Sequence, residues 1–422
     1  MNHIASPDPA VALRDQARAA RVAARALAGS SDAQRREALL AAARALRGAA
    51  ETAILSANAA DLAGSKAKGS FLDRLRLDRA RLSAMADGVA AVASLPDPLG
   101  RVLAEWDRPN GLRLRRVSVP IGVIGMIYES RPNVGADAGA LCLRSGNAVL
   151  LRGGSESART AVEIHAAMVA GLAEAGLPDA AIQIAPTTDR AYVAAMLGAS
   201  GAIDLIIPRG GKSLVERVQA EARIPVLAHG DALNHSYVHQ DADPAMARRL
   251  LANAKMRRTG VCGATETLLI DAACADVLLP GIVAELRALG CRCLGDARAR
   301  AILPDLDPAS TEDFHTEWLD SVLSIAVVDG IDAALAHIAA HGSTHTEAII
   351  TENADAAARF LNGVDAAVVM WNASTQFCDG GEFGFGAEIG IATGRLHARG
   401  PVGLEQLTSY RYEVIGTGQV RP

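Results

Sequence analysis

The chain has few aromatic residues and no excess of positive charge. Phe, Trp and Tyr make up 3% of its 422 residues, which argues against binding nucleic acid by base stacking. Asp and Glu number 47 against 42 Lys and Arg, so the net charge of −5 provides no general field that would attract a polyanion. Any anion site is therefore expected to be local.

Cysteine and long hydrophobic runs are also scarce. Six cysteines are too few for a disulfide scaffold and indicate a reducing compartment, in which one thiol can be reactive. No run of about 18 apolar residues is present, so no membrane span is expected. The Arg- and Ala-rich stretch after Val11 has the composition of a mitochondrial transit peptide, but Asp8 and Asp15 favour an ordinary amphipathic helix. We expect a cytoplasmic protein with no membrane or nucleic-acid partner.

The spacing of the hydrophobic residues, which are 50% of the chain, changes along the sequence. Residues 10–106 are expected to be helical, with breaks at 29–32 and 64–69. Short runs rich in Val, Ile and Leu then alternate with Ala-rich helical segments. This alternation predicts parallel sheets covered by helices on both faces, in one block before His229 and a second block after it.

The expected elements follow from this pattern. Strands of the first block are expected at 117–128, 147–152, 182–184, 203–207 and 225–228. Strands of the second block are expected at 236–239, 265–271, 322–328, 347–351 and 366–370. The clearest helices are expected at 157–175, 212–222, 244–256, 275–289, 331–341 and 353–361. Residues 376–400 are expected to be a loop, and 409–416 a strand that pairs with another element or another subunit.

Two glycine-rich turns each follow an expected strand and open an expected helix. They are Arg152-Gly153-Gly154-Ser155 and Arg209-Gly210-Gly211-Lys212. Such turns can present backbone N–H groups to a phosphate, or they can simply cap a helix. Neither matches the Rossmann fingerprint, and the second has Ile206 where a P-loop needs glycine. Two such turns, each beside a cation, favour a nucleotide site and make an ATP site a weak interpretation.

Cys262 differs in its surroundings from the other cysteines. It stands in Thr259-Gly260-Val261-Cys262-Gly263-Ala264, between the cation-rich end of an expected helix, at 255–258, and an expected strand. Small neighbours leave a sulfur atom accessible, and nearby cations favour the thiolate, which is the nucleophilic form. On local context alone, a packed core cysteine remains the alternative.

A metal site is not expected. The Cys291–Cys293 pair lacks the second pair of ligands that zinc needs. His337, His341 and His345 are four residues apart, but Gly342 is expected to end their helix and no further ligand stands beside them. Structural or substrate-contacting roles are therefore favoured for these histidines.

Several motifs, in one order along the whole chain, resemble the aldehyde dehydrogenase superfamily and, within it, the glutamate-5-semialdehyde dehydrogenases (γ-glutamyl phosphate reductases). They are PIGVIG at 120–125 with YESRPN at 128–133, VLLRGGS at 149–155, the Cys262 segment, HGSTHTE at 341–347 and RGPVGLE at 399–405. The resemblance implies an α/β fold with two three-layer α/β domains, open mainly parallel sheets and a β oligomerisation arm. It implies a nucleotide-binding domain over 1–230 with a return near 385–404, a catalytic domain over 231–384, and an arm over 109–121 and 405–422.

The resemblance also implies a reaction of proline biosynthesis, in which NADPH reduces L-glutamyl 5-phosphate to L-glutamate 5-semialdehyde and phosphate is released. Cys262 is then the nucleophile that forms a thioester, and the amide of Asn133 donates to the oxyanion. Ala228 stands where hydrolytic members of the superfamily carry a general-base glutamate. Its presence fits exchange with phosphate, which needs no base to activate water, although Asp231 or His229 can still serve as a base.

Cofactor and substrate positions follow from the same resemblance. Arg152 stands where the superfamily contacts the nucleotide ribose, and Ser155 stands where NAD-preferring members carry a glutamate, so NADP(H) is favoured on charge grounds. The other implied cofactor positions are Gly153, Gly154, Gly210, Gly211, Lys212 and Glu317. The implied substrate positions, without individual roles, are Arg131, His229, Asp231, His345 and Glu388. Arg131 can equally make a structural ion pair.

The implied partners are L-glutamyl 5-phosphate, phosphate, the upstream glutamate kinase and further copies of the chain in a homodimer or homotetramer. Two other hypotheses stay open. One is a hydrolytic or CoA-acylating aldehyde dehydrogenase of the same fold, and the other is a non-catalytic nucleotide-binding protein on that scaffold.

Overall fold

The structure is a computed structural model that describes residues 8–66, 69–129 and 131–421. Ser130 of the YESRPN motif lies outside the described residues. So do the first seven residues of the predicted nucleotide-binding domain and the last residue of the predicted arm. The chain divides into two compact units. Unit 1 comprises Met1–Ala228, Gly384–Gly390 and Val402–Pro422, and unit 2 comprises His229–Phe383 and Ile391–Pro401. The nucleotide-binding and catalytic roles of the two domains stay predictions.

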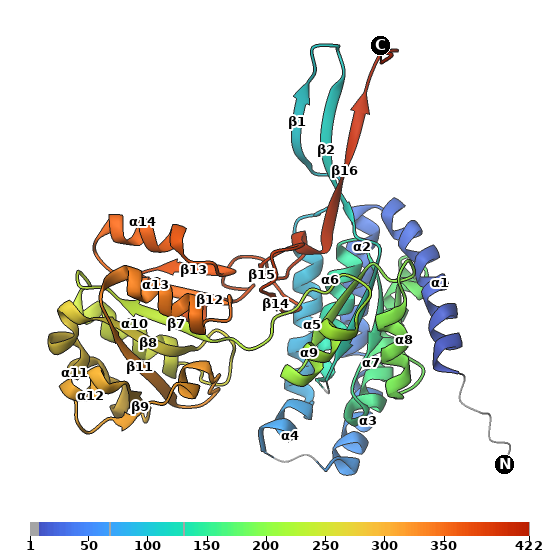
Figure 1. Cartoon of the computed structure of the whole chain (residues 1–422). Helices are drawn as coiled ribbons and strands as arrows, with labels where there is room; N and C mark the ends of the chain where they lie inside the picture. Colours follow the sequence, from blue (N-terminus) through green and yellow to red (C-terminus); the bar gives the residue numbers. More distant parts are fainter. Residues whose placement is uncertain (1–7, 67–68, 130, 422) are drawn as a thin grey trace. The chain divides into compact units, whose positions relative to one another are not determined.

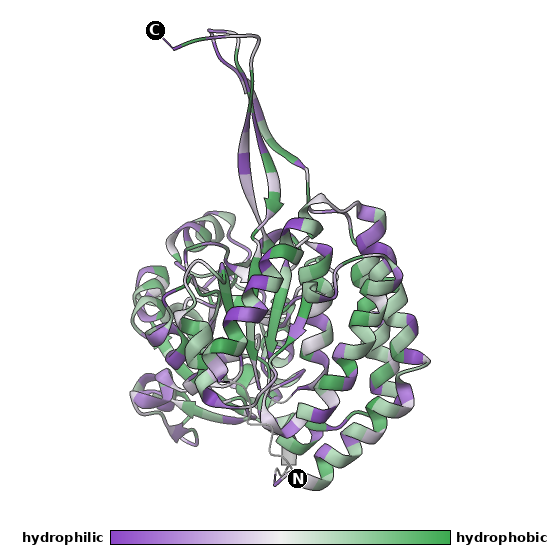
Figure 2. Ribbon diagram, turned by 90° about the vertical axis from the view of Figure 1, so that its right-hand side faces the viewer, coloured by the Kyte–Doolittle hydropathy of each residue, from purple (hydrophilic) through white to green (hydrophobic). Residues whose placement is uncertain are grey.

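A parallel sheet lies at the centre of unit 1. Among the described residues it has four strands in the order β5-β4-β3-β6. They are β3 (Val123–Tyr128), β4 (Ala148–Arg152), β5 (Ile182–Ile184) and β6 (Leu205–Arg209). Every residue of β3 is buried, as a parallel strand with both faces covered requires. Figure 2 shows these central strands as hydrophobic ribbons among helices of mixed character.

Some helices of unit 1 pack on this sheet, and others pack on those helices. They are α1 (Pro9–Gly29), α2 (Asp32–Arg47), α3 (Glu51–Gly64), α4 (Gly69–Leu75), α5 (Arg79–Ser94), α6 (Pro132–Arg144), α7 (Ala158–Glu174), α8 (Arg190–Gly198) and α9 (Lys212–Glu221). Local sequence sets their ends: Ser31 and Gln34 form a capping box at the start of α2. Helices α2 and α7 pack closely, because Gly171 of α7 presents no side chain to Ala38 and Ala42 of α2.

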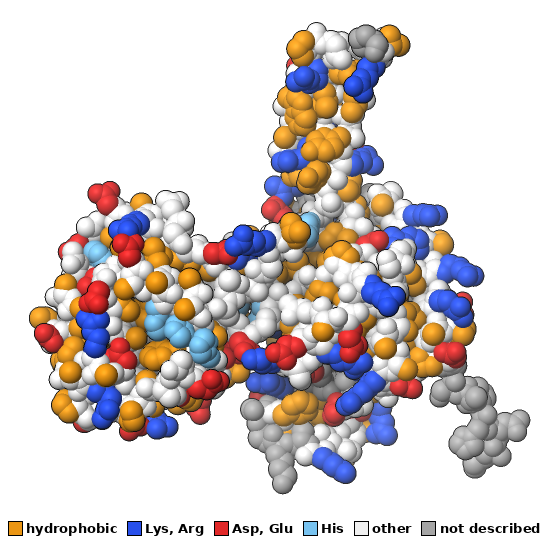
Figure 3. Space-filling view, viewed as in Figure 1, with side chains coloured by type: hydrophobic (Ala, Val, Ile, Leu, Met, Phe, Trp, Pro, Cys, Tyr) orange, Lys and Arg blue, Asp and Glu red, His pale blue; other side chains and the backbone are white. Residues whose placement is uncertain are grey.

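A second sheet of unit 1 forms an arm that extends away from its helices (Figure 1). The arm consists of β1 (Val102–Asp107), β2 (Arg113–Pro120) and β16 (Thr408–Ile415), with β2 in the middle and antiparallel to both neighbours. Its side chains are unusually apolar for a surface, as Figure 3 shows on the visible face. The exposed apolar residues of these strands are Val102, Leu103, Trp106, Tyr410, Tyr412, Val414 and Ile415.

Unit 2 contains a longer parallel sheet. Among the described residues its order is β10-β9-β11-β8-β7-β12-β13, with all neighbours parallel. The strands are β7 (Asn234–Val238), β8 (Thr265–Asp271), β9 (Arg292–Gly295), β10 (Asp307–Pro308), β11 (Val322–Val328), β12 (Thr346–Ile350) and β13 (Val368–Trp371). A short antiparallel pair, β14 (Ile391–Ala392) and β15 (Gly400–Pro401), also belongs to this unit.

Helices lie on both faces of the unit 2 sheet. They are α10 (Pro244–Met256), α11 (Ala272–Ala288), α12 (Ala297–Ile302), α13 (Gly330–His341) and α14 (Ala354–Gly363). Alternate residues of β8 enter different cores: Leu268 and Ile270 pack with α10, α11 and α12, whereas Leu269 packs with α13 and α14. The three-layer α/β arrangement predicted from alternating strands and helices is therefore confirmed. In the described part of the chain, no helix has both the length and the hydropathy of a membrane span.

Some predicted elements are wrong. Residues 102–107 form strand β1 and not a helical end, and 117–128 is divided between β2 and β3, which belong to different sheets. Residues 225–228 form only an isolated bridge from Val226 to Ile206. The sequence analysis also missed β9, which ends at Gly295, and the short elements α12 and β10. The predicted arm ranges contain β2 and β16 but leave out β1.

The close approach of α2 and α7 leads to a stability prediction. Alanine normally stabilises a helix relative to glycine by about 1 kcal/mol. In Gly171→Ala, however, the new methyl group would lie about 2.6 Å from the backbone nitrogen of Ala42, so overpacking should lower stability by about 1–3 kcal/mol. Thermal unfolding measures the change. The matched control is Gly198→Ala in α8, where a methyl group meets nothing within 4 Å and stability should be unchanged or higher. Equal effects of the two changes would contradict the packing described.

Candidate active site

Cys262 lies on the turn between α10 and β8 in unit 2. Its side chain is half-buried and packs against a cluster formed by Ala348, Val368, Met370, Cys378 and Ile391. The buried side chain of Asn234, at the start of β7, fixes this turn by hydrogen bonds. Its amide Nδ2 donates to the carbonyls of Cys262 (2.6 Å) and Ala264 (2.8 Å). Its Oδ1 accepts from the N–H of Thr346 at 3.1 Å, which ties the turn to the start of β12.

Two histidines lie beside the thiol. One side-chain atom from each of His229, Cys262 and His345 lies within 4.8 Å of the other two. The two imidazole rings meet edge to face, with centroids 5.1 Å apart. His345 is fully buried, and burial, with a smaller contribution from His229, lowers the pKa of its imidazole to about 3. His345 is therefore neutral at pH 7, and as a weak base it can share a hydrogen bond at the thiol but not hold its proton.

Local hydrogen bonds orient both rings. The Nδ1 of His229 is 2.7 Å from the carbonyl of Gly230, which can only accept, so Nδ1 carries a proton. The Nδ1 of His345 is 2.9 Å from the hydroxyl of Thr346, whereas its buried Nε2 has no hydrogen-bond partner among the described residues. Thr344, just before His345, has a φ of 60°, which is unfavourable for a β-branched residue. Such strain is typical of functional segments.

The cations that precede Cys262 are engaged elsewhere. The ammonium group of Lys255 is buried and 2.5 Å from Glu266, whose own pKa burial raises to about 7. Arg257 reaches the side chain of Gln376 at 3.5 Å. Lys255 is thus paired with Glu266, and the effect of these cations on the thiol stays a prediction. Glu317 is half-buried and close enough to raise the pKa of Glu266 further.

The first glycine turn of unit 1 lines a pocket. Gly153 and Gly154 line a cavity of about 340 Å³ together with residues 184–188, the last residue of β5 and the four that follow it. The guanidinium of Arg152 donates to the carbonyls of Gly153 (2.8 Å) and Thr188 (2.6 Å), and its buried Nε has no partner among the described residues. Ser155 is exposed at the start of the following 3-10 turn. Arg152 thus bonds to two of the residues that line the pocket.

The second glycine turn already faces a carboxylate. The N–H of Gly211 donates to Oε1 of Glu129 at 3.0 Å. A methyl group on Gly210 would lie about 2.7 Å from the same side chain, so glycine permits this approach. Lys212 is exposed at the first position of α9. Glu129, which follows β3, thus satisfies a donor at the helix start that was predicted for phosphate.

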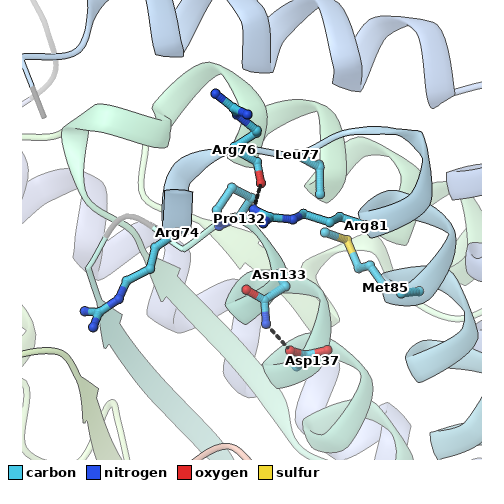
Figure 4. Close-up of a pocket in the computed structure, with 9 residues that line it drawn as sticks. Arg74, Arg76, Leu77, Arg81, Met85, Pro132, Asn133 and Asp137 are labelled. Carbon is cyan, nitrogen blue, oxygen red and sulfur yellow. Dashed lines mark hydrogen bonds between the residues drawn. The ribbon is translucent and has the colours of Figure 1, made fainter. Parts of the chain in front are cut away.

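Asn133 lines another pocket of unit 1, of about 380 Å³ (Figure 4). It lies in the first turn of α6 and donates its amide to Asp137, one turn on, at 2.8 Å. Burial raises the pKa of Asp137 to about 6 against the opposing effects of Asn133 and Arg209. The residues lining the pocket are Arg74, Arg76, Leu77, Arg81, Ala84, Met85, Pro132, Asn133 and Asp137. Figure 4 shows Arg81 donating to the backbone of Arg76 within this group.

The remaining predicted residues are more scattered. Arg131 is half-buried at the N-cap of α6, where its side chain makes no cap. Asp231 is half-buried near His229 in sequence, and Glu388 is half-buried in the return segment of unit 1. The structure thus brings together Cys262, His229 and His345 in unit 2. Sequence reasoning missed Asn234, Glu129 and Asp137; only Glu129 gave a signal, as a polar residue at the end of a hydrophobic run.

The chain that carries this fold and these sites is an aldehyde dehydrogenase. The sequence model described as "Aldehyde dehydrogenase family" matches residues 9–301, and the chain belongs to this family, whose enzymes use nicotinamide cofactors. The γ-glutamyl phosphate reductase of Acidiphilium cryptum is 66% identical to this chain over 99% of both sequences. That of Gluconobacter oxydans is 68% identical over 95% of this chain and 94% of its own length.

Solved structures agree. The crystal structure of γ-glutamyl phosphate reductase from Thermotoga maritima is 41% identical, with a TM-score of 0.95, and the match covers 97% of this chain and 100% of that one. The predicted fold class and the predicted resemblance are therefore confirmed.

The raised pKa of Asp137 leads to a prediction for stability against pH. In the unfolded chain this carboxyl group titrates near 3.8, and in the folded chain at about 6. The native state therefore holds its proton longer, and stability from this group is greatest below pH 4 and lost as the pH rises through about 6. Asparagine does not ionise, so Asp137→Asn does not lose this stability. The variant should therefore become more stable relative to the parent protein as the pH rises from 4 to 6. Chemical denaturation at a series of pH values measures the difference.

Asp329→Asn is the control of opposite sign. The hydrogen bond from Arg298 lowers the pKa of Asp329, so its contribution is present at neutral pH and lost as the pH falls. This variant should therefore lose stability relative to the parent protein at neutral pH. An Asp137→Asn profile parallel to that of the parent protein would contradict the raised pKa.

Proposed function

We propose that this chain reduces L-glutamyl 5-phosphate to L-glutamate 5-semialdehyde, with release of phosphate, in proline biosynthesis. The observation that carries the proposal is the half-buried thiol of Cys262 between two imidazoles, one of them neutral and buried. The name of the relatives that are 66–68% identical over nearly the whole chain supports the substrate. Unit 2 then supplies the nucleophile, and unit 1 binds the nucleotide.

In the proposed reaction the sulfur of Cys262 attacks the acyl carbon, and the C–O bond to phosphate breaks to leave a thioester. The thiol proton leaves with the released phosphate, and burial keeps His345 neutral beside the sulfur, with a pKa too low for it to hold that proton at neutral pH. The negative charge that develops on the acyl oxygen is stabilised by donors, for which we propose the amide of Asn133 and the N–H of Cys262. After reduction, the tetrahedral carbon expels the sulfur and the aldehyde is released.

We propose NADPH as the cofactor, which when bound supplies the hydride. The pocket lined by Gly153 and Gly154 fits a nucleotide, and the unpartnered Nε of Arg152 fits an anionic or hydroxyl oxygen beside it. Ser155 adds no negative charge that would repel a 2′-phosphate. For the second turn, the proposal requires the Glu129 carboxylate to be displaced from Gly211 before a phosphate can bind there. Gly210, Lys212 and Glu317 stay predicted cofactor contacts.

Ala228, in place of a general-base glutamate, favours this proposal over a hydrolytic enzyme, although Asp231 and His229 stay open as alternative bases. Ala228 is buried and non-polar at the position where hydrolytic relatives carry a glutamate. An enzyme that passes its acyl group to phosphate needs no such base, and water attack on the thioester would waste substrate.

Arg131, Asp231 and Glu388 stay predicted contacts for the amino-acid head group. We also propose the kinase that makes the acyl phosphate as a partner, and a reducing compartment, since none of the six cysteines forms a disulfide.

The reverse reaction tests the proposal. Reduction of NADP⁺ by glutamate semialdehyde should require phosphate, and Cys262→Ala should lower the rate by at least about 10³-fold because the covalent path is lost. Cys293→Ala, which removes a buried thiol of strand β9, should retain activity. Turnover in phosphate-free buffer would instead favour a hydrolytic enzyme, and a requirement for CoA an acylating one. Cofactor binding without any turnover would favour the non-catalytic alternative.

We further propose that the arm joins copies of the chain into a dimer or tetramer. Its strands β1 and β16 are sheet edges, which offer unpaired backbone groups to another copy. Apolar side chains cluster on it, with Trp106 packed edge-on against Tyr412 at 6.1 Å. Val414, for example, is 58% exposed. Such exposed apolar surface is unfavourable in water unless another copy covers it.

A single charge on the arm tests this assembly. In Val414→Asp the buried charge should weaken the contact between copies, and light scattering should detect a lower mass. Val277→Asp is the matched control, because Val277 is 78% exposed on α11 and lies outside the arm. An unchanged mass for Val414→Asp, or the same mass change in both variants, would rule out the arm as the contact.

A further inference from the structure

We propose that His229, Cys262 and His345 also form a binding site for a divalent transition-metal ion, Zn²⁺ above all, which blocks the nucleophile reversibly. Their ligand atoms lie within 4.8 Å of one another without any metal. In a tetrahedral zinc site, bonds of about 2.0–2.3 Å hold ligand atoms about 3.3–3.6 Å apart. Side-chain shifts of about 1 Å therefore suffice to close the site.

The histidines are oriented as metal ligands usually are. A ligating imidazole typically donates its other N–H to a protein oxygen, which fixes the ring and the tautomer. His229 makes such a bond from Nδ1 to Gly230, and the Nδ1 of His345 bonds to the hydroxyl of Thr346. The Nε2 of His345 is buried without a hydrogen-bond partner among the described residues. A metal ion would satisfy this atom, and the neutral state of the ring keeps its lone pair available.

The same buried amide holds two of the three ligands. Asn234 bonds to the carbonyl of Cys262 and to the N–H of Thr346, the residue that follows His345. The hydroxyl of Ser343 accepts from the N–H of Leu233 at 2.8 Å, which ties the segment before His345 to the residue before β7 a second time. Little ordering is then needed when the metal binds, and this favours affinity.

The ligand types select the ion. Two imidazoles and one thiolate suit Zn²⁺ and Co²⁺, whereas Mg²⁺ and Ca²⁺ prefer oxygen ligands. Three protein ligands leave the fourth position of a tetrahedral ion open to water or an exchangeable anion. Binding releases the thiol proton to solvent, so affinity should rise with pH. The occupied sulfur can no longer attack an acyl group, and inhibition, unlike metal binding itself, rests on the proposed function.

Cobalt provides a direct readout, because Co²⁺ bound to a thiolate absorbs by charge transfer and tetrahedral Co²⁺ has strong visible bands. Titration of the full-length protein with Co²⁺, without phosphate or chelator, should give one such site per chain, and Zn²⁺ should displace the signal. Cys262→Ala should abolish the charge-transfer band. His229→Asn and His345→Asn should each weaken binding by at least about tenfold.

A second histidine group of unit 2 gives the matched control. His315 and His341 approach within 3.0 Å through their ring nitrogens, and His337 lies beside His341. This group includes no thiolate, so His315→Asn should leave the charge-transfer band unchanged. The proposal is overturned if the folded protein gives no band, if the band survives Cys262→Ala, or if His315→Asn removes it.

The remaining variants keep the test decisive. Because His345 is buried, its variant can fail to fold, whereas His229 is only half-buried and tests the site independently. A His229→Asn protein with unchanged affinity would contradict the three-ligand site. Cobalt binding at Cys262 in a protein with no dehydrogenase turnover would retain the metal site and refute the proposed reaction. Phosphate-dependent turnover without cobalt binding would support the proposed reaction and refute the metal site.

Discussion

The side chain of Asn234 makes three hydrogen bonds inside unit 2, to the carbonyls of Cys262 and Ala264 and from the N–H of Thr346. It is completely buried, and each of these bonds satisfies a polar group that would otherwise cost about 1–3 kcal/mol inside the protein. The turn that carries the thiol and the segment that carries His345 are thereby fixed to one strand. The chemistry that we propose for unit 2 depends on this constraint, because a nucleophile and its neighbouring imidazoles act only when their separation is fixed.

Strand order explains why these residues meet. His229 precedes β7, Cys262 precedes β8 and His345 precedes β12, and the three strands are adjacent in the order β8-β7-β12. Because neighbouring strands are parallel, their amino ends lie at one edge of the sheet. Residues more than 30 positions apart therefore become neighbours. The arrangement leaves Cys262 half-buried and His345 fully buried, so the thiol stays reachable while one imidazole is kept neutral.

In unit 1 the residues predicted to bind a ligand lie instead at the carboxyl ends of the strands. Its glycine turns follow β4 and β6, which flank β3 on opposite sides, so the chain reverses direction of winding at β3. Ligands of open α/β sheets bind outside the carboxyl ends of the strands at such a point. Glu129 lies directly after β3 and its carboxylate is held by Gly211. This carboxylate satisfies the donor of the turn, so a phosphate of the proposed cofactor would have to displace it there.

Sequence by itself determined the periodicities and the local turns: helix α10 and strands β5, β8 and β11 begin and end where the pattern predicted, and Cys262 stood out by its small neighbours. It did not determine that 117–128 would be divided between two sheets, because both parts are apolar and only the pairing of β2 with β16 separates them. It also gave no means to see Lys255 bound to Glu266, or His345 beside Cys262. Those contacts depend on which strands are adjacent, and strand order is a property of the folded chain, since hydrophobic alternation is the same for every order.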